Sequence, residues 1–207
     1  MTDLVLVRHG ETVWHAENRY AGISDVELTP RGREQAAELA SWAAGAGLTA
    51  VWASTLSRAR ITAQAAADQA GLPVRTDERL RELDFGQGEG LTSAEMKARF
   101  PEARAAFEAD PAGNPLPGGE DPYEAAGRFT AALDDIAAAH SGGRVLVVAH
   151  TTAIRLALCG LLGVPLGEYR RLFPRLDNCA LTELRLCDAR TGRVAMLQYN
   201  SPIGAVR

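Results

Sequence analysis

Two histidines in this chain of 207 residues each follow an apolar run that is typical of a buried strand. His9 comes directly after Arg8 and the run at residues 4–7, and His150 follows the run at residues 144–149. Neighbouring strands lie about 4.8 Å apart, so two such strands side by side would bring both imidazoles to one small ligand. The pair predicts a site at one edge of a sheet.

A third basic side chain, Arg58, falls in the first turn of a helix that is predicted to follow a strand at residues 51–53. Ser57 is the predicted N-cap of that helix. The free N–H groups of a helix N-terminus favour an anion. Two histidines and two arginines together predict an oxyanion pocket, although each of them alone is more typical of an ordinary turn residue.

The elements that would position these side chains alternate along the chain. One helix is predicted to open at Thr29 and Pro30 and to stop before Gly45. Strands and helices that alternate in this way predict an α/β fold with a mostly parallel sheet, and ligands bind at the carboxyl edge of such sheets. The other predicted helices cover residues 57–70, 92–100, 102–109, 121–140 and 152–162, and the predicted strands cover 4–7, 51–53, 73–76, 144–149, 179–186 and 193–199.

Composition narrows the class of protein. Hydrophobic residues make up 46% of the chain, enough for the core of a single domain over residues 1–207. A net charge of −4 argues against a nucleic-acid partner, which requires a concentrated basic surface. No apolar run approaches the roughly 20 residues of a membrane span, and the first residues do not resemble a secretory signal. We therefore expect a cytoplasmic protein without a membrane partner.

Metal and nucleotide sites find little support in the sequence. Lys97 is the sole lysine and no Ser or Thr follows it, which excludes a P-loop. The glycines at 86, 88 and 90 do not have the spacing of a dinucleotide-binding loop. The three cysteines, predicted to be reduced core thiols, form no CxxC pair, and no metal-ligand spacing is recognisable. We expect neither a metal nor another cofactor.

The residues around His9 resemble a known signature. Residues 6–12, Leu-Val-Arg-His-Gly-Glu-Thr, are similar to the signature of the histidine phosphatase superfamily, which has the phosphoglycerate mutase-like fold. The resemblance continues in order through residues 54–63, 80–86, 117–120 and 148–150, so it covers most of the chain. It implies a three-layer sandwich, with helices on both faces of a mostly parallel central sheet.

This resemblance implies a role for each residue of the pocket. His9 would be the nucleophile and form a phosphohistidine, a task that suits a neutral imidazole with a free lone pair. Arg8, Arg58 and His150 would surround the phosphoryl oxygens and offset their charge. Because the arginines supply that charge, no metal is required.

Two carboxyl groups compete for the role of general acid. The resemblance assigns it to Glu82, which would protonate the leaving oxygen and then activate water. Without the resemblance, Glu82 would be interpreted as a surface partner of Arg79 or Arg81. Glu11 is adjacent to the nucleophile and is more suited to orienting the backbone or a nearby arginine, so it ranks below Glu82.

Some positions depart from the family pattern. His15 stands where many relatives have an asparagine, and it is either a phosphate donor or part of a packed turn. Thr151 stands where a glycine is usual and is expected to donate to phosphate, while Gly88 replaces a tryptophan and puts one wall of the site in doubt. Asn18 and Gly22 match the pattern and are expected to bind substrate.

Residues 92–120 are predicted to form an inserted lid. The lid mixes acidic and basic residues and identifies no dedicated second phosphate clamp, and it is shorter than expected for a mutase, so hydrolysis of a phosphomonoester is favoured. The expected substrate is a small metabolite such as a sugar phosphate or a phosphoglycerate-like molecule. The alternatives are a phosphoglycerate mutase and a binding module without turnover. The sequence leaves monomer and homodimer open.

Overall fold

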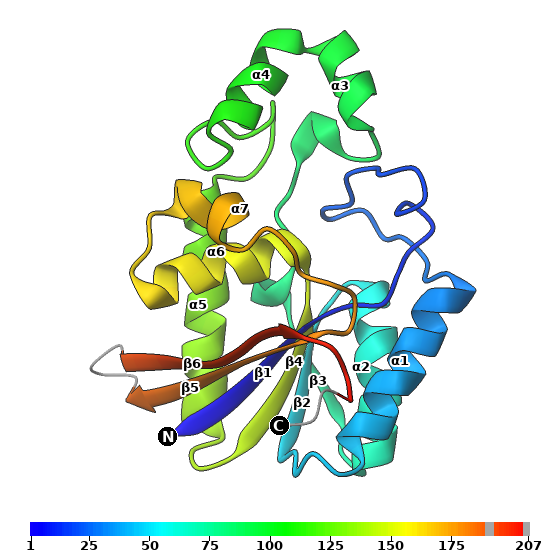
Figure 1. The fold of residues 1–207 in the computed structure, drawn as a ribbon, viewed down its shortest axis with the longest axis vertical. Coiled ribbons are helices and arrows are strands. Elements are labelled where there is room, and N and C mark those ends of the chain that lie inside the picture. The colour runs from blue at the N-terminus through cyan, green and yellow to red at the C-terminus, as the bar shows by residue number, and fades with distance from the viewer. Residues whose placement is uncertain (189–192, 205–207) are drawn as a thin grey trace.

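One sheet organises the chain in the computed structural model, which describes residues 1–188 and 193–204. Its strands are ordered β3-β2-β4-β1-β5-β6 (Figure 1). The first four in the sequence are parallel, and β5 and β6 are antiparallel to their neighbours. Their bounds are β1 Thr2–Arg8, β2 Ala50–Ser54, β3 Val74–Asp77, β4 Arg144–Ala149, β5 Leu181–Asp188 and β6 Arg193–Ser201.

The pairing of β1 with β4 places the two histidines at one level. Arg8 lies opposite Ala149 in this parallel pair, so His9 and His150 are the next residues of adjacent strands. The His9 amide still donates to the Ala149 carbonyl oxygen at 3.1 Å. Both strands are buried on both faces, as their continuous apolar runs predict. The prediction that both imidazoles meet at the carboxyl edge is confirmed.

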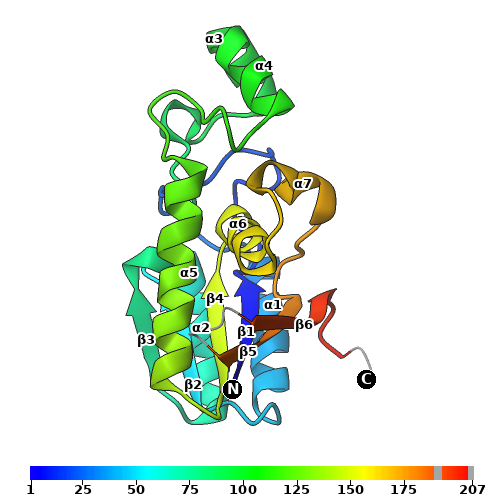
Figure 2. The same cartoon turned by 90° about the vertical axis from the view of Figure 1, so that its left-hand side faces the viewer.

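Helices cover both faces of the sheet (Figure 2). On one face, Val5 and Val7 of β1 pack with side chains of α1 (Pro30–Ala43) and α2 (Ser57–Ala70). On the other face, Leu4 and Leu6 pack with side chains of α5 (Pro122–Ala139) and α6 (Thr151–Leu162). The alternation of side chains along β1 thus divides the core in two. The three-layer α/β sandwich is confirmed.

A helical segment projects beyond the carboxyl edge of the sheet (Figure 1). It contains α3 (Ser93–Arg99) and α4 (Pro101–Ala109), and it lies within the insertion predicted at residues 92–120. Thr92 and Glu95 form a reciprocal capping box at the start of α3. Four short elements were not predicted: the 3₁₀ turns Glu78–Leu80, Gly86–Gly88 and Leu166–Glu168, and helix α7 (Tyr169–Leu172).

Three local predictions differ from the structure. Leu56, not Ser57, is the N-cap of α2, and the Ser57 hydroxyl donates to Asp25 Oδ1 at 2.6 Å. The strand predicted from residue 179 begins two residues later, because Cys179 has a φ of +60°. Cys159 and Cys179 are buried thiols, but Cys187 is exposed, so its assignment to the core was wrong. None of the helices in the described residues is long and apolar enough to cross a membrane.

Candidate active site

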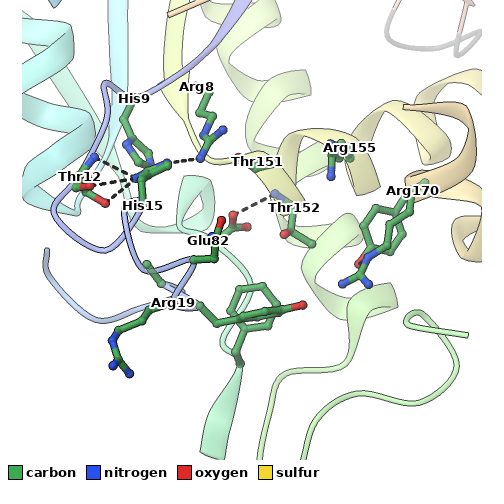
Figure 3. A pocket seen from close by; sticks show the side chains of 15 residues that line it. Arg8, His9, Thr12, His15, Arg19, Glu82, Thr151, Thr152, Arg155 and Arg170 are labelled. Atoms are coloured by element: carbon green, nitrogen blue, oxygen red, sulfur yellow. Dashed lines mark hydrogen bonds between the residues drawn. The ribbon is translucent and has the colours of Figure 1, made fainter. Parts of the chain in front are cut away.

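A cavity of about 450 Å³ lies at the carboxyl edge of β1 and β4 (Figure 3). Its size suits a small metabolite. The structure brings six of the nine predicted site residues to its wall: Arg8, His9, His15, Asn18, Glu82 and Thr151. The remaining three, Arg58, His150 and Gly22, do not line the cavity.

His9 presents one ring nitrogen as a base. Its Nδ1 lies 2.7 Å from the Gly10 carbonyl oxygen, which can only accept, so Nδ1 carries the hydrogen and the lone pair is on Nε2. Burial holds the pKa of His9 well below its usual value, and the charges of Arg58 and Arg8 lower it further. The imidazole is therefore neutral, and Nε2 is the nucleophilic atom.

Arg58 lies behind His9 and is fully buried. Its Nε donates to His9 Nε2 at 3.2 Å, and its two terminal nitrogens donate to the carbonyl oxygens of Ser24 and Gly22 at 2.7 and 2.6 Å. Burial lowers the pKa of this guanidinium. The described ion pairs include no partner for Arg58. Its charge therefore lies beside the nucleophile without a direct ion pair in the described part of the chain, with Glu82, Asp25 and Glu89 acting on it from further away.

His150 is buried next to His9. The ring centroids lie 5.1 Å apart, and neither ring nitrogen of His150 bonds to another group in the described part of the chain. Burial, followed by the charge of Arg58, holds the pKa of His150 well below its usual value. A buried polar group without a partner costs about 1–3 kcal/mol, so this imidazole is poised for a polar ligand.

Arg8 and His15 contact each other at the cavity wall. Arg8 donates to the Leu176 carbonyl oxygen at 2.9 Å, and its Nη2 contacts His15 Nε2. Its buried Nε has no partner within residues 1–188 and 193–204. Burial lowers the pKa of Arg8 to about 10. Burial, followed by the charge of Arg8, lowers the pKa of His15 to about 4, so His15 is neutral near pH 7.

The Nδ1 of His15 accepts from the Thr12 amide at 2.9 Å and lies 2.8 Å from Thr12 Oγ1, so the turn at residues 12–15 holds the ring with Nε2 against Arg8. The ring then orients the Arg8 guanidinium. A direct contact between His15 and phosphate stays a prediction.

Glu82 lies at the N-terminus of α6. Its Oε2 accepts from the Thr152 amide at 2.9 Å, and its Oε1 accepts from the Ala153 amide at 2.8 Å and the Leu83 amide at 2.9 Å. The carboxyl group is 4% exposed, so the alternative of a surface ion pair is wrong. The competing acid Glu11 accepts from the Thr29 hydroxyl at 2.8 Å and does not line the cavity.

Asn18, Thr151 and Gly22 were predicted to bind phosphate or substrate, and they differ in their positions relative to the cavity. Asn18 lines the cavity with a φ of +52°, and Thr151 lines it as the first residue of α6. Gly22 lies outside the wall: its amide donates to Glu89 at 3.1 Å, and a Cβ on it would lie 2.0 Å from Glu89 Oε1. Gly22 thus allows a tight packing of the loop that holds Arg58, and binding of substrate by Gly22 stays a prediction.

Sequence reasoning missed part of the wall. Arg155 lies one helical turn after Thr151, so the i, i+4 spacing on a helix was a signal that could have found it. Arg170 lies on the unpredicted helix α7 and gave no such signal. Tyr169, Arg19 and Tyr20 also line the cavity. Among the residues that the structure describes, no group of three or more His, Cys, Asp or Glu side chains could hold a metal ion.

Comparison with known proteins extends over almost the whole chain. Residues 4–200 match the model of the histidine phosphatase superfamily (branch 1). The chain is 37% identical over 184 residues to a protein of Erwinia tasmaniensis named probable phosphoglycerate mutase, and the match covers 89% of this chain and 85% of that one.

Solved structures agree with this match. A mycobacterial glucosyl-3-phosphoglycerate phosphatase is 30% identical with a TM-score of 0.88, over 97% of this chain and 99% of that one. A phosphoserine phosphatase of Entamoeba histolytica, solved in complex with 3-phosphoglyceric acid, is 30% identical with a TM-score of 0.85, over 98% of each chain. The similar proteins thus carry the names of two activities, phosphatase and mutase.

Proposed function

This chain belongs to the histidine phosphatase superfamily, branch 1, and is an enzyme of that family; we propose that it hydrolyses small phosphomonoesters through a phosphohistidine on His9. The observation that carries the proposal is the neutral, buried His9 beside polar atoms that have no hydrogen-bond partner among the described residues. These atoms are both ring nitrogens of His150 and Nε of Arg8. A phosphoryl group in front of the nucleophile would accept hydrogen bonds from Arg8 Nε and from the one N–H of the neutral His150 ring.

The first half-reaction transfers the phosphoryl group to the enzyme. His9 Nε2 forms a bond to phosphorus, and the bond from phosphorus to the ester oxygen breaks. Glu82, entering this step with a proton, gives it to the departing oxygen, so the alcohol leaves neutral. Arg8, Arg58 and His150 stabilise the charge on the phosphoryl oxygens, and Arg58 Nε, released from His9, becomes free to donate to one of them.

The second half-reaction returns the enzyme to its starting state. Glu82 takes a proton from water, whose oxygen attacks phosphorus, and the bond from His9 Nε2 to phosphorus breaks. Inorganic phosphate leaves, and Glu82 again carries the proton it gave up. Every charge that this cycle requires comes from side chains of the chain itself, which supports turnover without a metal or another cofactor.

The insertion that carries α3 and α4 would act as a lid on this cavity within a single domain. Support comes from Arg170 at the cavity wall, whose guanidinium carbon lies 4.7 Å from the ring centroid of Phe107 on α4. Tyr20, also on the wall, accepts a hydrogen bond from Arg104 of α4 at 3.0 Å. Movement of α4 would therefore reach the wall directly.

A phosphoglycerate mutase is the second candidate, favoured by the name of the Erwinia tasmaniensis relative. The test measures phosphate release from a panel of phosphomonoesters in chelator, with isomerisation of 3-phosphoglycerate followed in parallel. Release by the wild type that His9→Ala abolishes is the expected result. Isomerisation without release would favour the mutase, and neither activity would favour a binding module.

A further inference from the structure

Two arginines lie on the cavity wall away from His9. Arg155 extends from α6 and Arg170 from α7, on the opposite side of the cavity from His9 and His15 (Figure 3). No ion pair in the described residues includes either guanidinium. By contrast, Arg19 on the same wall pairs with Glu17 at 2.7 Å and with Glu95 at 2.8 Å.

Arg155 is held in place by Pro174 and Tyr199. Its Nη2 donates to the Pro174 carbonyl oxygen at 2.7 Å, and it also hydrogen-bonds the Tyr199 side chain, while its buried Nε has no partner in the described part of the chain. The charge of Arg155, after burial, contributes to the lowered pKa of Arg8. The two guanidinium groups therefore repel each other, and an anion between them would relieve that repulsion.

Arg170 is oriented by aromatic side chains. Its Nε donates to the Tyr169 hydroxyl at 3.0 Å, and its guanidinium lies over the rings of Phe107 and Tyr169, with centroids at 4.7 and 5.5 Å. None of the hydrogen bonds in the described chain uses its two terminal nitrogens. Arg170 is thus fixed at one end and free to donate at the other.

The charges along the wall exceed what one phosphoryl group requires. Arg8 and Arg58 already match the two negative charges of a phosphomonoester. Glu82 is the one acidic residue among those that line the cavity. Arg155 and Arg170 add two positive charges to this end of the cavity that form no ion pair in the described residues, in a chain whose net charge is −4.

We propose that Arg155 and Arg170 form a subsite for a second anionic group of the substrate. This rests on the proposed function and names its substrate class: small phosphomonoesters that also carry a carboxylate or a second phosphate. Thr151 and Arg155 lie one helical turn apart on α6, and both line the cavity. The predicted lid therefore need not supply the second anion site.

The test compares three esters of similar length. 3-Phosphoglycerate carries a carboxylate, 1,3-propanediol bisphosphate carries a second phosphate, and glycerol 3-phosphate carries an uncharged hydroxymethyl group. The variants are Arg155→Gln, Arg170→Gln and a matched control, Arg171→Gln. Arg171 lies next to Arg170 on α7, but it is 71% exposed and pairs with Glu168 outside the cavity wall. Thermal unfolding confirms that each variant is folded.

We expect the wild type to prefer a doubly anionic ester over glycerol 3-phosphate in kcat/KM. Arg155→Gln and Arg170→Gln should each reduce kcat/KM for that ester about 10- to 100-fold more than for glycerol 3-phosphate, mainly through KM. Arg155→Lys should recover part of the preference, and Arg171→Gln should retain it. A preference for 3-phosphoglycerate would identify the second group as a carboxylate, and a preference for 1,3-propanediol bisphosphate would identify it as a phosphate.

Equal losses for all three esters, or no preference in the wild type, would overturn the subsite and leave the phosphatase proposal intact. If no ester is hydrolysed, calorimetric Kd values for the same esters separate the two proposals. Tighter binding of a doubly anionic ester, lost in both Gln variants, would keep the subsite and overturn the hydrolytic function. Equal Kd values would overturn the subsite as well.

Discussion

Three neighbouring residues set the reactivity of His9 Nε2. Gly10 fixes the hydrogen on Nδ1, while Arg58 and Arg8 disfavour a proton on the ring. Sequence reasoning found His9 and Arg8 because they directly follow a strand-like run. It could not find that His15 contacts Arg8, since that contact depends on the turn at residues 12–15 rather than on residue type.

The lowered pKa of His9 predicts the acid side of the pH profile. The neutral ring is the active form and the protonated ring is inactive, so kcat/KM falls as pH drops through the pKa of folded His9. Because that pKa is well below its usual value of about 6.5, we expect His9 to cause no loss of kcat/KM between pH 7 and 6. The measurement is kcat/KM from pH 4.5 to 9, and an acid limb centred near pH 6.5 would contradict the assignment.

Glu82 and Glu11 can be separated by matched substitutions. Glu82→Gln removes the proposed proton donor but keeps the shape, so we expect kcat to fall about 10²- to 10⁴-fold. Glu11→Gln changes a carboxyl group outside the cavity wall that bonds Thr29, and it should reduce kcat less than tenfold. Steady-state kinetics of both variants on one ester measure the two losses of kcat. A larger loss in Glu11→Gln would reverse the roles.

At the scale of elements, the loop after β1 is pressed against the start of α1. A Cβ on Gly32 of α1 would lie 2.1 Å from the Glu11 carbonyl oxygen, and a Cβ on Gly10 would lie 2.3 Å from the Gly32 carbonyl oxygen. The sequence predicted the cap of α1 at Thr29, which accepts from the Gly32 amide. It could not predict the close contact, because glycines in a helix and in a loop give no sign of meeting.

Replacing Gly32 therefore tests whether α1 positions the nucleophile. Gly32→Ala should lower the free energy of unfolding by about 1–3 kcal/mol and reduce kcat, because the backbone next to His9 must shift. Gly127→Ala is the control, since Gly127 is an exposed residue of α5 with no atom within 4 Å of an added Cβ. It should raise stability by about 0.5–1 kcal/mol and leave kcat unchanged. Urea unfolding measures the free energy of unfolding, and steady-state kinetics measure kcat. Equal changes in the two variants would contradict a positioning role for Gly32.

For the whole molecule, the sandwich was predictable because alternating strand and helix patterns leave few ways to bury both sheet faces. The cavity wall that α7 forms could not be predicted from the sequence. Helix α7 is too short for a periodic pattern, and the packing of Phe107 against Arg170 joins segments 63 residues apart. The order of motifs thus specified the reacting end of the site, while tertiary packing determines the end that selects the substrate.

Buried neutral histidines predict how stability depends on pH. Below about pH 6.5 the unfolded chain binds a proton at His150 that the folded chain does not, so the free energy of unfolding decreases as pH falls. The limiting slope is about 1.4 kcal/mol per pH unit for each such histidine. His150→Gln should reduce the slope between pH 6.5 and 5 in urea unfolding.

His140→Gln is the matched control for that slope. His140 is only partly buried and accepts from Trp52 Nε1 at 3.2 Å. Its pKa is lowered less than that of His150, so the slope should change less. An equal change in both variants would show that burial of His150 does not set the acid sensitivity.

The covalent intermediate that we propose on His9 can be trapped and identified. Wild-type protein is mixed with excess phosphomonoester, quenched in base, where phosphohistidine survives, and digested for mass spectrometry. We expect a phosphorylated peptide that contains His9 in the wild type and no such peptide in folded His9→Ala. Turnover with no phosphorylated His9 peptide, or phosphate release by His9→Ala at the wild-type rate, would contradict it.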